Sequence, residues 1–328
     1  MASEKPTAGP VVIVFHHTNV GDLLFSLPLL AGVRAGWSGA RVTSAACAYL
    51  LALVRGTGLV DEVLERPTRT WPKLRLARRL ARRRFDIAVC LAMSGETSLL
   101  ARLTGAGRRI GFSGTQWPSL LTERVPFSPP PSLGNALAML EYLGLPVVAH
   151  DYVGLVPKDQ SAAVRAQELL RGLGVEGAYL AVAPGAGPRR RHKAWAPESF
   201  GLAAKTVADA RGWRVVVVGS HSEREMAQAV LNACPSAVNL VGRTDLVTLA
   251  EVLRAAGFFL GNDSGPMHLA AAVETPLLGI FGPTDAAKTG PCGRYSRVVM
   301  APAGDLSALR PEAVSEAALA LFAEAGRR

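Results

Sequence analysis

The sequence contains few cysteines and few aromatic residues. Aromatic residues make up 6% of its 328 residues. The four cysteines lie far apart, and none shows Cys-x-x-Cys spacing or forms a Cys/His cluster with zinc-ligand spacing. They are Cys47, Cys90, Cys234 and Cys292. We therefore expect reduced, mostly buried thiols and no metal site.

Long hydrophobic runs and targeting patterns are absent as well. No stretch reaches the roughly 18 continuous apolar residues that a membrane-spanning helix needs. The longest candidates, residues 11–15 and 45–54, are too short. Residues 1–10 are polar and lack the pattern of a secretory signal. We expect a protein that stays in the cytoplasm.

Two common phosphate-binding fingerprints, G-x-G-x-x-G and the Walker A sequence, do not occur, and neither does Asp-x-Asp. The formal charge of +10 and the pI of about 9.9 nevertheless favour acidic partners. Phosphates, anionic lipid and nucleic acid all meet that description, and charge alone does not distinguish among them.

The apolar content, 49% of the residues, is mainly Ala, Leu and Val, which suits helices packed on parallel strands. Short buried-strand patterns alternate with helical patterns in the first half, and Pro28 should kink the first helix. The predicted strands are 11–15, 41–45, 86–91 and 109–112, and the predicted helices are 20–34, 49–55, 71–84, 96–103 and 133–143. This alternation predicts an α/β fold with a doubly wound parallel sheet.

The second half repeats the architecture. The predicted strands are 179–183, 213–219, 258–261 and 277–281, and the predicted helices are 197–211, 222–233, 246–256, 264–273 and 311–325. Residues 146–157 read as an extended linker. A length of 328 residues also suits about two domains of roughly 100–200 residues each. We predict domains at residues 1–155 and 156–328.

Ligands of open α/β sheets bind at the carboxyl ends of the strands, and several polar segments fall there. The first, His-His-Thr-Asn-Val-Gly-Asp at residues 16–22, places Asp22 at the start of a helix. Asp22 is either a helix cap or a general base that a helix N-terminus keeps ionised. The residues leave both interpretations open.

A second segment, Pro-Gly-Ala-Gly-Pro at 184–188, is followed by the basic run 189–193. The amides around Gly185 and Ala186 could cradle a phosphate, with Lys193 as countercharge; the alternative is a solvated loop. Glu223, just past another strand, could hold ribose hydroxyls or simply favour a helix start.

The third segment, residues 261–268, leaves a strand and opens a helix. Ser264 and Gly265 offer backbone N–H groups at a positive helix end, which is a diphosphate site, and His268 lies one turn further on. The segment 281–285 repeats the strand-to-turn pattern and is expected to shape the same crevice.

A basic segment covers residues 73–84, where seven of twelve residues are Lys or Arg and four apolar residues recur at helical spacing. Arg78, Arg79 and Arg82 could face anionic lipid or an acidic acceptor. The alternative is an exposed helix with a solvated face. No aromatic residues are interleaved with these arginines, so we expect no nucleic-acid partner.

Three motifs in the same order resemble glycosyltransferase family nine, the bacterial heptosyltransferases. They are VGDLLFSLPLL at 20–30, VAPGAGPRRRHKAWAPESF at 182–200 and GNDSGPMHLAAAVETPLLGIFGPTD at 261–285. The resemblance implies a GT-B fold, in which two Rossmann-like domains face a cleft and the last helix packs back on the N-terminal domain. The N-terminal domain would bind the acceptor and the C-terminal domain the nucleotide-sugar donor.

The resemblance also implies an inverting, metal-independent transfer of heptose from ADP-heptose to the inner core of lipopolysaccharide, with no cofactor. Asp22 resembles the catalytic base and Lys193 the phosphate-binding lysine. Asp263, Ser264, Gly265 and His268 resemble the donor loop, and Glu223 a ribose-binding acid. The expected partners are an ADP-sugar and an acidic glycolipid, with work at the inner face of the cytoplasmic membrane.

Three other functions fit the same residues. A family member could act on a soluble metabolite or a protein acceptor. A nucleotide-sugar epimerase could use the same fold, and would convert donor without any acceptor. A non-catalytic protein could bind nucleotide-sugars and show no turnover.

Overall fold

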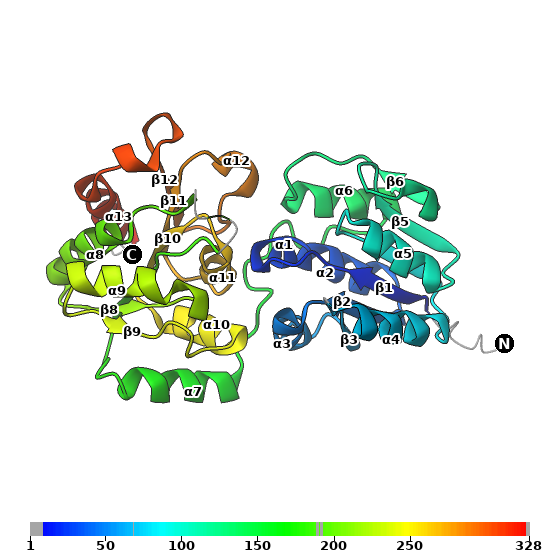
Figure 1. Ribbon diagram of the computed structural model, residues 1–328, viewed down its shortest axis with the longest axis horizontal. Coiled ribbons are helices and arrows are strands. Elements are labelled where there is room, and N and C mark those ends of the chain that lie inside the picture. The colour runs from blue at the N-terminus through cyan, green and yellow to red at the C-terminus, as the bar shows by residue number, and fades with distance from the viewer. Residues whose placement is uncertain (1–8, 68, 188–189, 191–192, 326–328) are drawn as a thin grey trace, which may run out of the picture. The chain divides into compact units, whose positions relative to one another are not determined.

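The computed structural model describes residues 9–67, 69–187, 190 and 193–325. The chain divides into two compact units, residues 1–152 and 153–328, and each is described by itself. The break lies three residues before the boundary expected from the sequence. Figure 1 shows that each unit has a central sheet with helices on both faces.

The sheet of the N-terminal unit has six parallel strands in the order β3-β2-β1-β4-β5-β6. This is the strand order of doubly wound nucleotide-binding folds, and its direction reverses between β1 and β4. The strands are β1 (Val11–Phe15), β2 (Arg41–Ala46), β3 (Glu62–Glu65), β4 (Ile87–Cys90), β5 (Arg108–Phe112) and β6 (Glu123–Val125).

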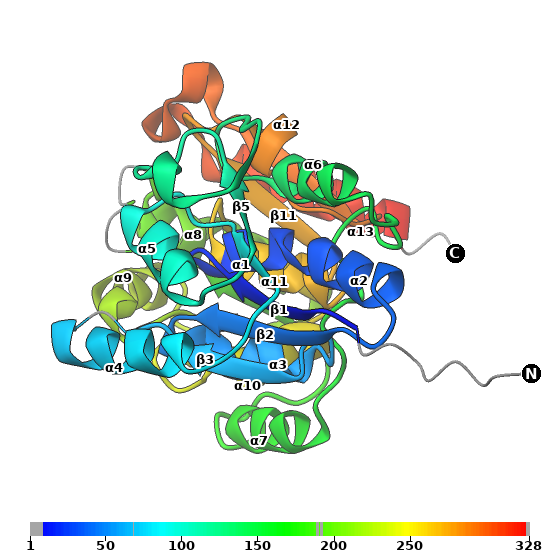
Figure 2. The same cartoon turned by 90° about the vertical axis from the view of Figure 1, so that its right-hand side faces the viewer.

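Helices cover both faces of this sheet because its strands are apolar on both sides. The side chains of α4 and α5 join one face in a core that includes Ile13, Phe15 and Cys90. The paired helices α2 and α6 lie against the other face (Figure 2). The helices are α1 (Val20–Phe25), α2 (Leu27–Gly36), η1 (Ala48–Leu50), α3 (Leu51–Gly56), α4 (Thr70–Ala81), α5 (Gly95–Leu103), η2 (Pro118–Leu120) and α6 (Leu133–Leu143).

The single helix predicted over residues 20–34 is two helices that meet at Ser26. Pro28 is at the second position of α2 and lacks the N–H that would continue the α1 ladder. The hydroxyl of Ser26 donates to Leu23 O at 2.5 Å, so it accepts from His16 Nδ1 at 2.9 Å. The break therefore joins the end of β1 to the helix that carries Asp22.

The C-terminal unit repeats the topology, with six parallel strands in the order β12-β11-β10-β7-β8-β9. Read in chain order, this is the arrangement of the first sheet, and its direction reverses between β7 and β10. The strands are β7 (Tyr179–Ala183), β8 (Arg214–Val217), β9 (Val238–Asn239), β10 (Phe258–Asn262), β11 (Leu277–Phe281) and β12 (Ser296–Met300).

One face of this sheet packs against α8, α9 and α13 in a core that contains Phe200, Phe258 and Leu321. The other face carries α10 and α11, and α7 packs on α10 (Figure 1). The helices are α7 (Gln160–Arg171), α8 (Pro197–Arg211), η4 (His221–Glu223), α9 (Arg224–Ala233), α10 (Leu246–Ala255), α11 (Gly265–Ala272), α12 (Ala286–Thr289), η5 (Pro302–Gly304), η6 (Leu306–Ala308) and α13 (Pro311–Ala325). The last helix, α13, contacts α8 of its own unit, and its expected packing on the N-terminal domain stays a prediction.

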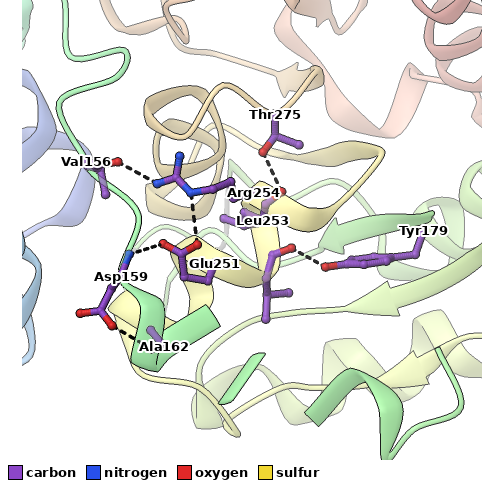
Figure 3. A network of polar contacts seen from close by, with 9 residues as sticks. Val156, Asp159, Ala162, Tyr179, Glu251, Leu253, Arg254 and Thr275 are labelled. Atoms are coloured by element: carbon purple, nitrogen blue, oxygen red, sulfur yellow. Dashed lines mark hydrogen bonds and ion pairs between the residues drawn. The ribbon is translucent and has the colours of Figure 1, made fainter. Parts of the chain in front are cut away.

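The chain that leads into the C-terminal unit is held by a buried carboxylate on α10 (Figure 3). Glu251 is 3% exposed; it accepts from the amide of Asp159 at 3.0 Å and pairs with Arg254 at 3.2 Å. Arg254 in turn donates to the carbonyl of Val156 at 2.7 Å. The linker segment 156–159 is therefore fixed to α10.

We predict that Glu251→Ala destabilises the C-terminal unit by about 2–4 kcal/mol, because it leaves Arg254 and the Asp159 amide without their acceptor. Urea denaturation followed by circular dichroism measures the change. Glu176→Ala is the control, since Glu176 is an exposed carboxylate that lines the same cavity as Glu251 and should change stability by less than about 0.5 kcal/mol. Equal effects of the two substitutions would contradict the role of Glu251 and Arg254 as a clamp that holds the linker segment 156–159.

A second prediction concerns pH. Burial, with smaller contributions from His17 and Arg66, lowers the pKa of His16 from 6.5 to about 3. The unfolded chain therefore binds a proton below about pH 6.5 that the folded chain excludes, so stability falls as the pH drops from 6.5 towards 3. At about pH 5 the loss should reach about 2 kcal/mol. Urea denaturation of wild type and His16→Asn at pH 7.5 and at about pH 5 measures this loss of stability. If the stability of the two proteins falls in parallel with pH, His16 is not the group responsible.

Candidate functional site

The carboxyl edge of the C-terminal sheet collects four of the segments singled out from the sequence. The turns after β7, β8, β10 and β11 begin at Pro184, Val218, Asp263 and Gly282. Side chains from the turns after β7, β10 and β11 contact one another, and Glu223 from the turn after β8 contacts the backbone of the turn after β7. The sheet reverses direction between β7 and β10. That edge is where doubly wound sheets bind nucleotides.

Lys193 and Asp263 form an ion pair at the centre of this edge. Lys193 Nζ lies 3.0 Å from Asp263 Oδ2, and their side chains are 16% and 8% exposed. Thr284 donates to the same carboxylate oxygen at 2.9 Å, which confirms that the turn after β11 belongs to this site. One carboxylate thus holds the turns after β7 and β11 beside the start of α11, and it leaves other N–H bonds of Lys193 for a ligand.

The start of α11 presents polar groups without protein partners. The hydroxyl of Ser264 is buried and has no hydrogen-bond partner among the described residues. The backbone amides of Ser264 and Gly265 donate to no described residue, as is usual for the first turn of a helix. These donors, next to Lys193, suit an anionic ligand. His268 is buried one turn further along.

Glu223 lies close to the turn after β7. A Cβ atom on Gly185 would stand 1.7 Å from Glu223 Oε1, so only glycine fits there. The other oxygen of Glu223 accepts from the amide and the hydroxyl of Ser220 at 2.6 and 2.9 Å. Glu223 Oε1 also accepts from the amide of Gly187 at 3.4 Å. The carboxylate therefore orders two turns of the site, and its contact with ribose stays a prediction.

Of the remaining residues expected here, Ala186 is buried in the turn after β7. Arg190 is described, whereas Pro188, Arg189, Arg191 and His192 of the basic run lie outside the described residues.

The N-terminal unit has its own pocket at the corresponding edge of its sheet. Asp22 and His17 lie on its wall, close enough that the carboxylate acts on the ring. The rest of the wall is apolar and aromatic with a few amide and hydroxyl groups: Phe25, Ser26, Leu91, Phe112, Phe127, Pro131, Ser132, Asn135 and Ala136. An acidic group in a small, mainly apolar pocket is a suitable place for proton transfer.

Asp22 is partly exposed, and its Oδ2 accepts from the side-chain amide of Asn19 at 2.7 Å. Burial lowers the pKa of His17, although the negative charge of Asp22 opposes that shift. The lowered pKa keeps the His17 imidazole neutral at neutral pH. The first turn of α1 thus presents the Asp22 carboxyl group to the pocket, next to the His17 ring.

Sequence reasoning missed two contributors to this edge. Asn135 is buried and holds the proline-rich turn through bonds to the backbone of Ser128 at 3.0 and 2.8 Å. Arg66 follows β3 and is 6% exposed, yet its Nη1 is buried without a hydrogen-bond partner among the described residues. Its charge lowers the pKa of both His16 and His17, which places it near the pocket. An unpaired buried guanidinium is costly, so a bound anion would stabilise it.

The basic segment forms α4, which ends at Ala81. Arg78 and Arg82 are exposed, whereas Arg79 pairs with Glu62 at 2.9 Å. These residues are therefore on the surface and separate from the Asp22 pocket.

A larger cavity, of about 620 Å³, lies between α7 and α10 at the opposite, amino-terminal edge of the second sheet. Its walls include Tyr179, the first residue of β7, and the linker clamp Glu251 and Arg254.

Within the described residues, no three His, Cys, Asp or Glu side chains are placed to hold a metal ion. Among the same residues, no helix has both the length and the apolarity needed to cross a bilayer.

Comparison with known proteins identifies the family of the chain. The model of glycosyltransferase family 9 (heptosyltransferase) matches residues 73–316. Lipopolysaccharide heptosyltransferase 2 of Escherichia coli K12 is 25% identical over 321 residues, which cover 88% of this chain and 87% of that protein. Lipopolysaccharide heptosyltransferase 3 of the same strain is 24% identical over 81% of this chain and 80% of its own.

Two solved structures share the fold. A glycosyl transferase of family 9 from Veillonella parvula superposes with a TM-score of 0.84 at 21% identity, covering 96% of this chain and 97% of its own. The E. coli ADP-heptose lipopolysaccharide heptosyltransferase II superposes with a TM-score of 0.83 at 23% identity, covering 96% of this chain and 99% of its own. The family match spans most of the chain, and the structures agree over both units. The chain therefore belongs to glycosyltransferase family 9, the heptosyltransferases, and is a glycosyltransferase with the GT-B fold.

Proposed function

We propose that the protein transfers heptose from ADP-heptose to an acidic acceptor of the lipopolysaccharide inner core, with inversion and without a metal ion. The observation that carries this proposal is the anion site of the C-terminal unit, where the Ser264 hydroxyl and the α11 amides are unpartnered beside Lys193. Family membership supplies the sugar class, since the relatives named above are heptosyltransferases. We place the reaction in the cytoplasm, at the inner face of the membrane.

The donor unit would stabilise the leaving group. When the bond between the sugar and ADP breaks, negative charge grows on the terminal phosphate. Lys193 supplies a cation, while the amides of Ser264 and Gly265 supply fixed N–H dipoles. The Asp263 carboxylate keeps Lys193 in place through their 3.0 Å pair. These groups can perform the charge stabilisation that a metal ion performs in other transferases.

The acceptor unit would supply the base. One oxygen of Asp22 is occupied by Asn19, so the other can accept the proton of an attacking hydroxyl. The acceptor oxygen then bonds to the anomeric carbon as ADP departs from the opposite face. A single displacement of this kind inverts the configuration at that carbon. The aromatic wall formed by Phe25, Phe112 and Phe127 suits the apolar faces of sugar rings.

Arg66 supports an acidic acceptor. Its guanidinium is buried, and its Nη1 is unpaired near the Asp22 pocket. A carboxylate or phosphate on the acceptor would give Nη1 the partner that it lacks among the described residues. A neutral soluble metabolite would leave Nη1 without that anionic partner.

For the donor, we predict that ADP and ADP-sugars raise the melting temperature, while UDP- and GDP-sugars at equal concentration do not. Lys193→Gln should weaken ADP binding about 10–100-fold, because one charge-assisted bond to phosphate is lost. Thermal-shift titration measures both effects. Lys205→Gln is the control, since Lys205 is an exposed lysine that pairs with Asp209 on α8. Stabilisation by UDP-sugars would reject the donor class.

For the base, we predict that Asp22→Asn lowers kcat by about 10²–10⁴-fold while ADP affinity changes less than about twofold. Substitution by Asn keeps the shape and the contact with Asn19 but removes the proton acceptor. Single-turnover assays with ADP-heptose and an inner-core acceptor measure the rate. Undiminished turnover would eliminate the assignment of the base.

The same assays separate the alternatives. Conversion of ADP-heptose to an isomer without any acceptor would indicate an epimerase. Turnover with soluble or protein acceptors but not with inner-core acceptors would keep the enzyme and change its acceptor. Donor binding with no turnover on a wide acceptor panel would indicate a binding protein.

A further inference from the structure

Helix α4 (Thr70–Ala81) has one face that is exposed among the described residues of its unit. Leu76 and Leu80 are buried, and they face the sheet. At about 100° per residue, the opposite side of the helix carries positions 71, 74, 75, 78 and, just past its end, 82. All five of these side chains are exposed: Trp71, Leu74, Arg75, Arg78 and Arg82. We call this set the α4 stripe.

The arginines of the stripe differ from their neighbours in pairing. Glu62 binds Arg79 and Arg83, and Glu96 binds Lys73 at 2.7 Å. Arg75, Arg78 and Arg82 have no ion-pair partner among the described residues. Together with Arg79 and Arg83 they line a shallow hollow of about 400 Å³ whose whole wall is arginine. The three arginines of the stripe therefore present a row of positive charge to the solvent, where it can bind anions.

The amino end of the stripe is apolar. Trp71 is 77% exposed and Leu74 is 45% exposed, and they lie one turn apart on the side of the helix that also carries the three arginines. Exposing a tryptophan to water is unfavourable, whereas the indole ring is stable at the headgroup level of a bilayer. A tryptophan and a leucine followed by a row of arginines match the two layers of an anionic membrane surface, acyl carbon and phosphate.

We propose that the α4 stripe docks the protein on the surface of a bilayer that contains anionic phospholipid. Trp71 and Leu74 enter the headgroup layer, and Arg75, Arg78 and Arg82 lie on lipid phosphates. Nucleic acid fits less well, because the only aromatic ring is at one end and is not interleaved with the arginines. This inference goes beyond the proposed function, since it concerns attachment and requires neither donor nor acceptor.

The test is vesicle co-sedimentation of the full chain with phosphatidylcholine alone and with phosphatidylcholine plus phosphatidylglycerol. We expect binding to the anionic vesicles only, weakening as salt is raised. The triple variant Arg75→Gln/Arg78→Gln/Arg82→Gln should bind roughly 100-fold more weakly, at about fivefold per arginine. The matched control is Arg55→Gln/Arg102→Gln/Arg124→Gln, which removes three exposed, unpaired arginines of the same unit and should bind within about threefold of wild type.

Trp71→Ser tests the apolar end, and it should weaken vesicle binding about tenfold at unchanged salt sensitivity. Wild type should also show tryptophan quenching by brominated lipid that Trp71→Phe loses.

Equal losses in the two triple variants would mean that overall charge, and not the stripe, attracts the vesicles, and would overturn the proposal. Binding to duplex DNA without binding to anionic vesicles would also overturn it. The vesicles contain no acceptor, so either result leaves the transferase assignment to its own assays.

Discussion

The side chain of Asn262, at the end of β10, makes the contacts on which the proposed donor site depends. Its Oδ1 accepts from the amide of Trp195 at 3.0 Å, and its Nδ2 donates to the carbonyl of Pro184 at 2.7 Å. Both ends of the long turn after β7 are thereby fixed to the strand that leads into α11. Trp195 is itself buried, and its Nε1 donates to the carbonyl of Leu309, so the end of the turn is anchored in the core. Lys193 can reach Asp263 only because this fully buried amide holds the backbone in place.

The two units share one strand order but have opposite chemistry at their carboxyl edges. In the C-terminal unit the turns end in a lysine, a helix start and a buried hydroxyl, which together attract an anion. In the N-terminal unit the first turn of α1 carries Asp22, and the pocket wall beside it contains aromatic side chains. A displacement reaction needs both kinds of site, one that accepts a proton and one that receives a departing diphosphate. Repetition of the fold supplies two edges, and the loop sequences make them different.

Much of the fold followed from apolar patterning, because a strand buried on both faces must be a continuous apolar run. Residues 11–15, 179–183 and 277–281 were predicted with the bounds of β1, β7 and β11. The edge strand β3 (Glu62–Glu65) and the partly exposed β12 were missed because charged or polar residues interrupt them. Helix α7 was missed beside the linker, since its apolar face is mostly alanine. Arg66 follows β3, so the patterning that missed this strand also missed Arg66.

Arg66 also shows why the acceptor edge could not be read from motifs. A lone arginine in a polar stretch has no signature, and its significance lies in burial that only the tertiary structure creates. The N-terminal unit keeps this cation beside two histidines whose pKa values it lowers, and among the described residues its Nη1 has no hydrogen-bond partner. Such an arrangement lowers the stability of the unliganded protein and raises it when an anion binds. Under the function proposed above, an acidic acceptor would complete the electrostatics of the pocket in which Asp22 would take its proton.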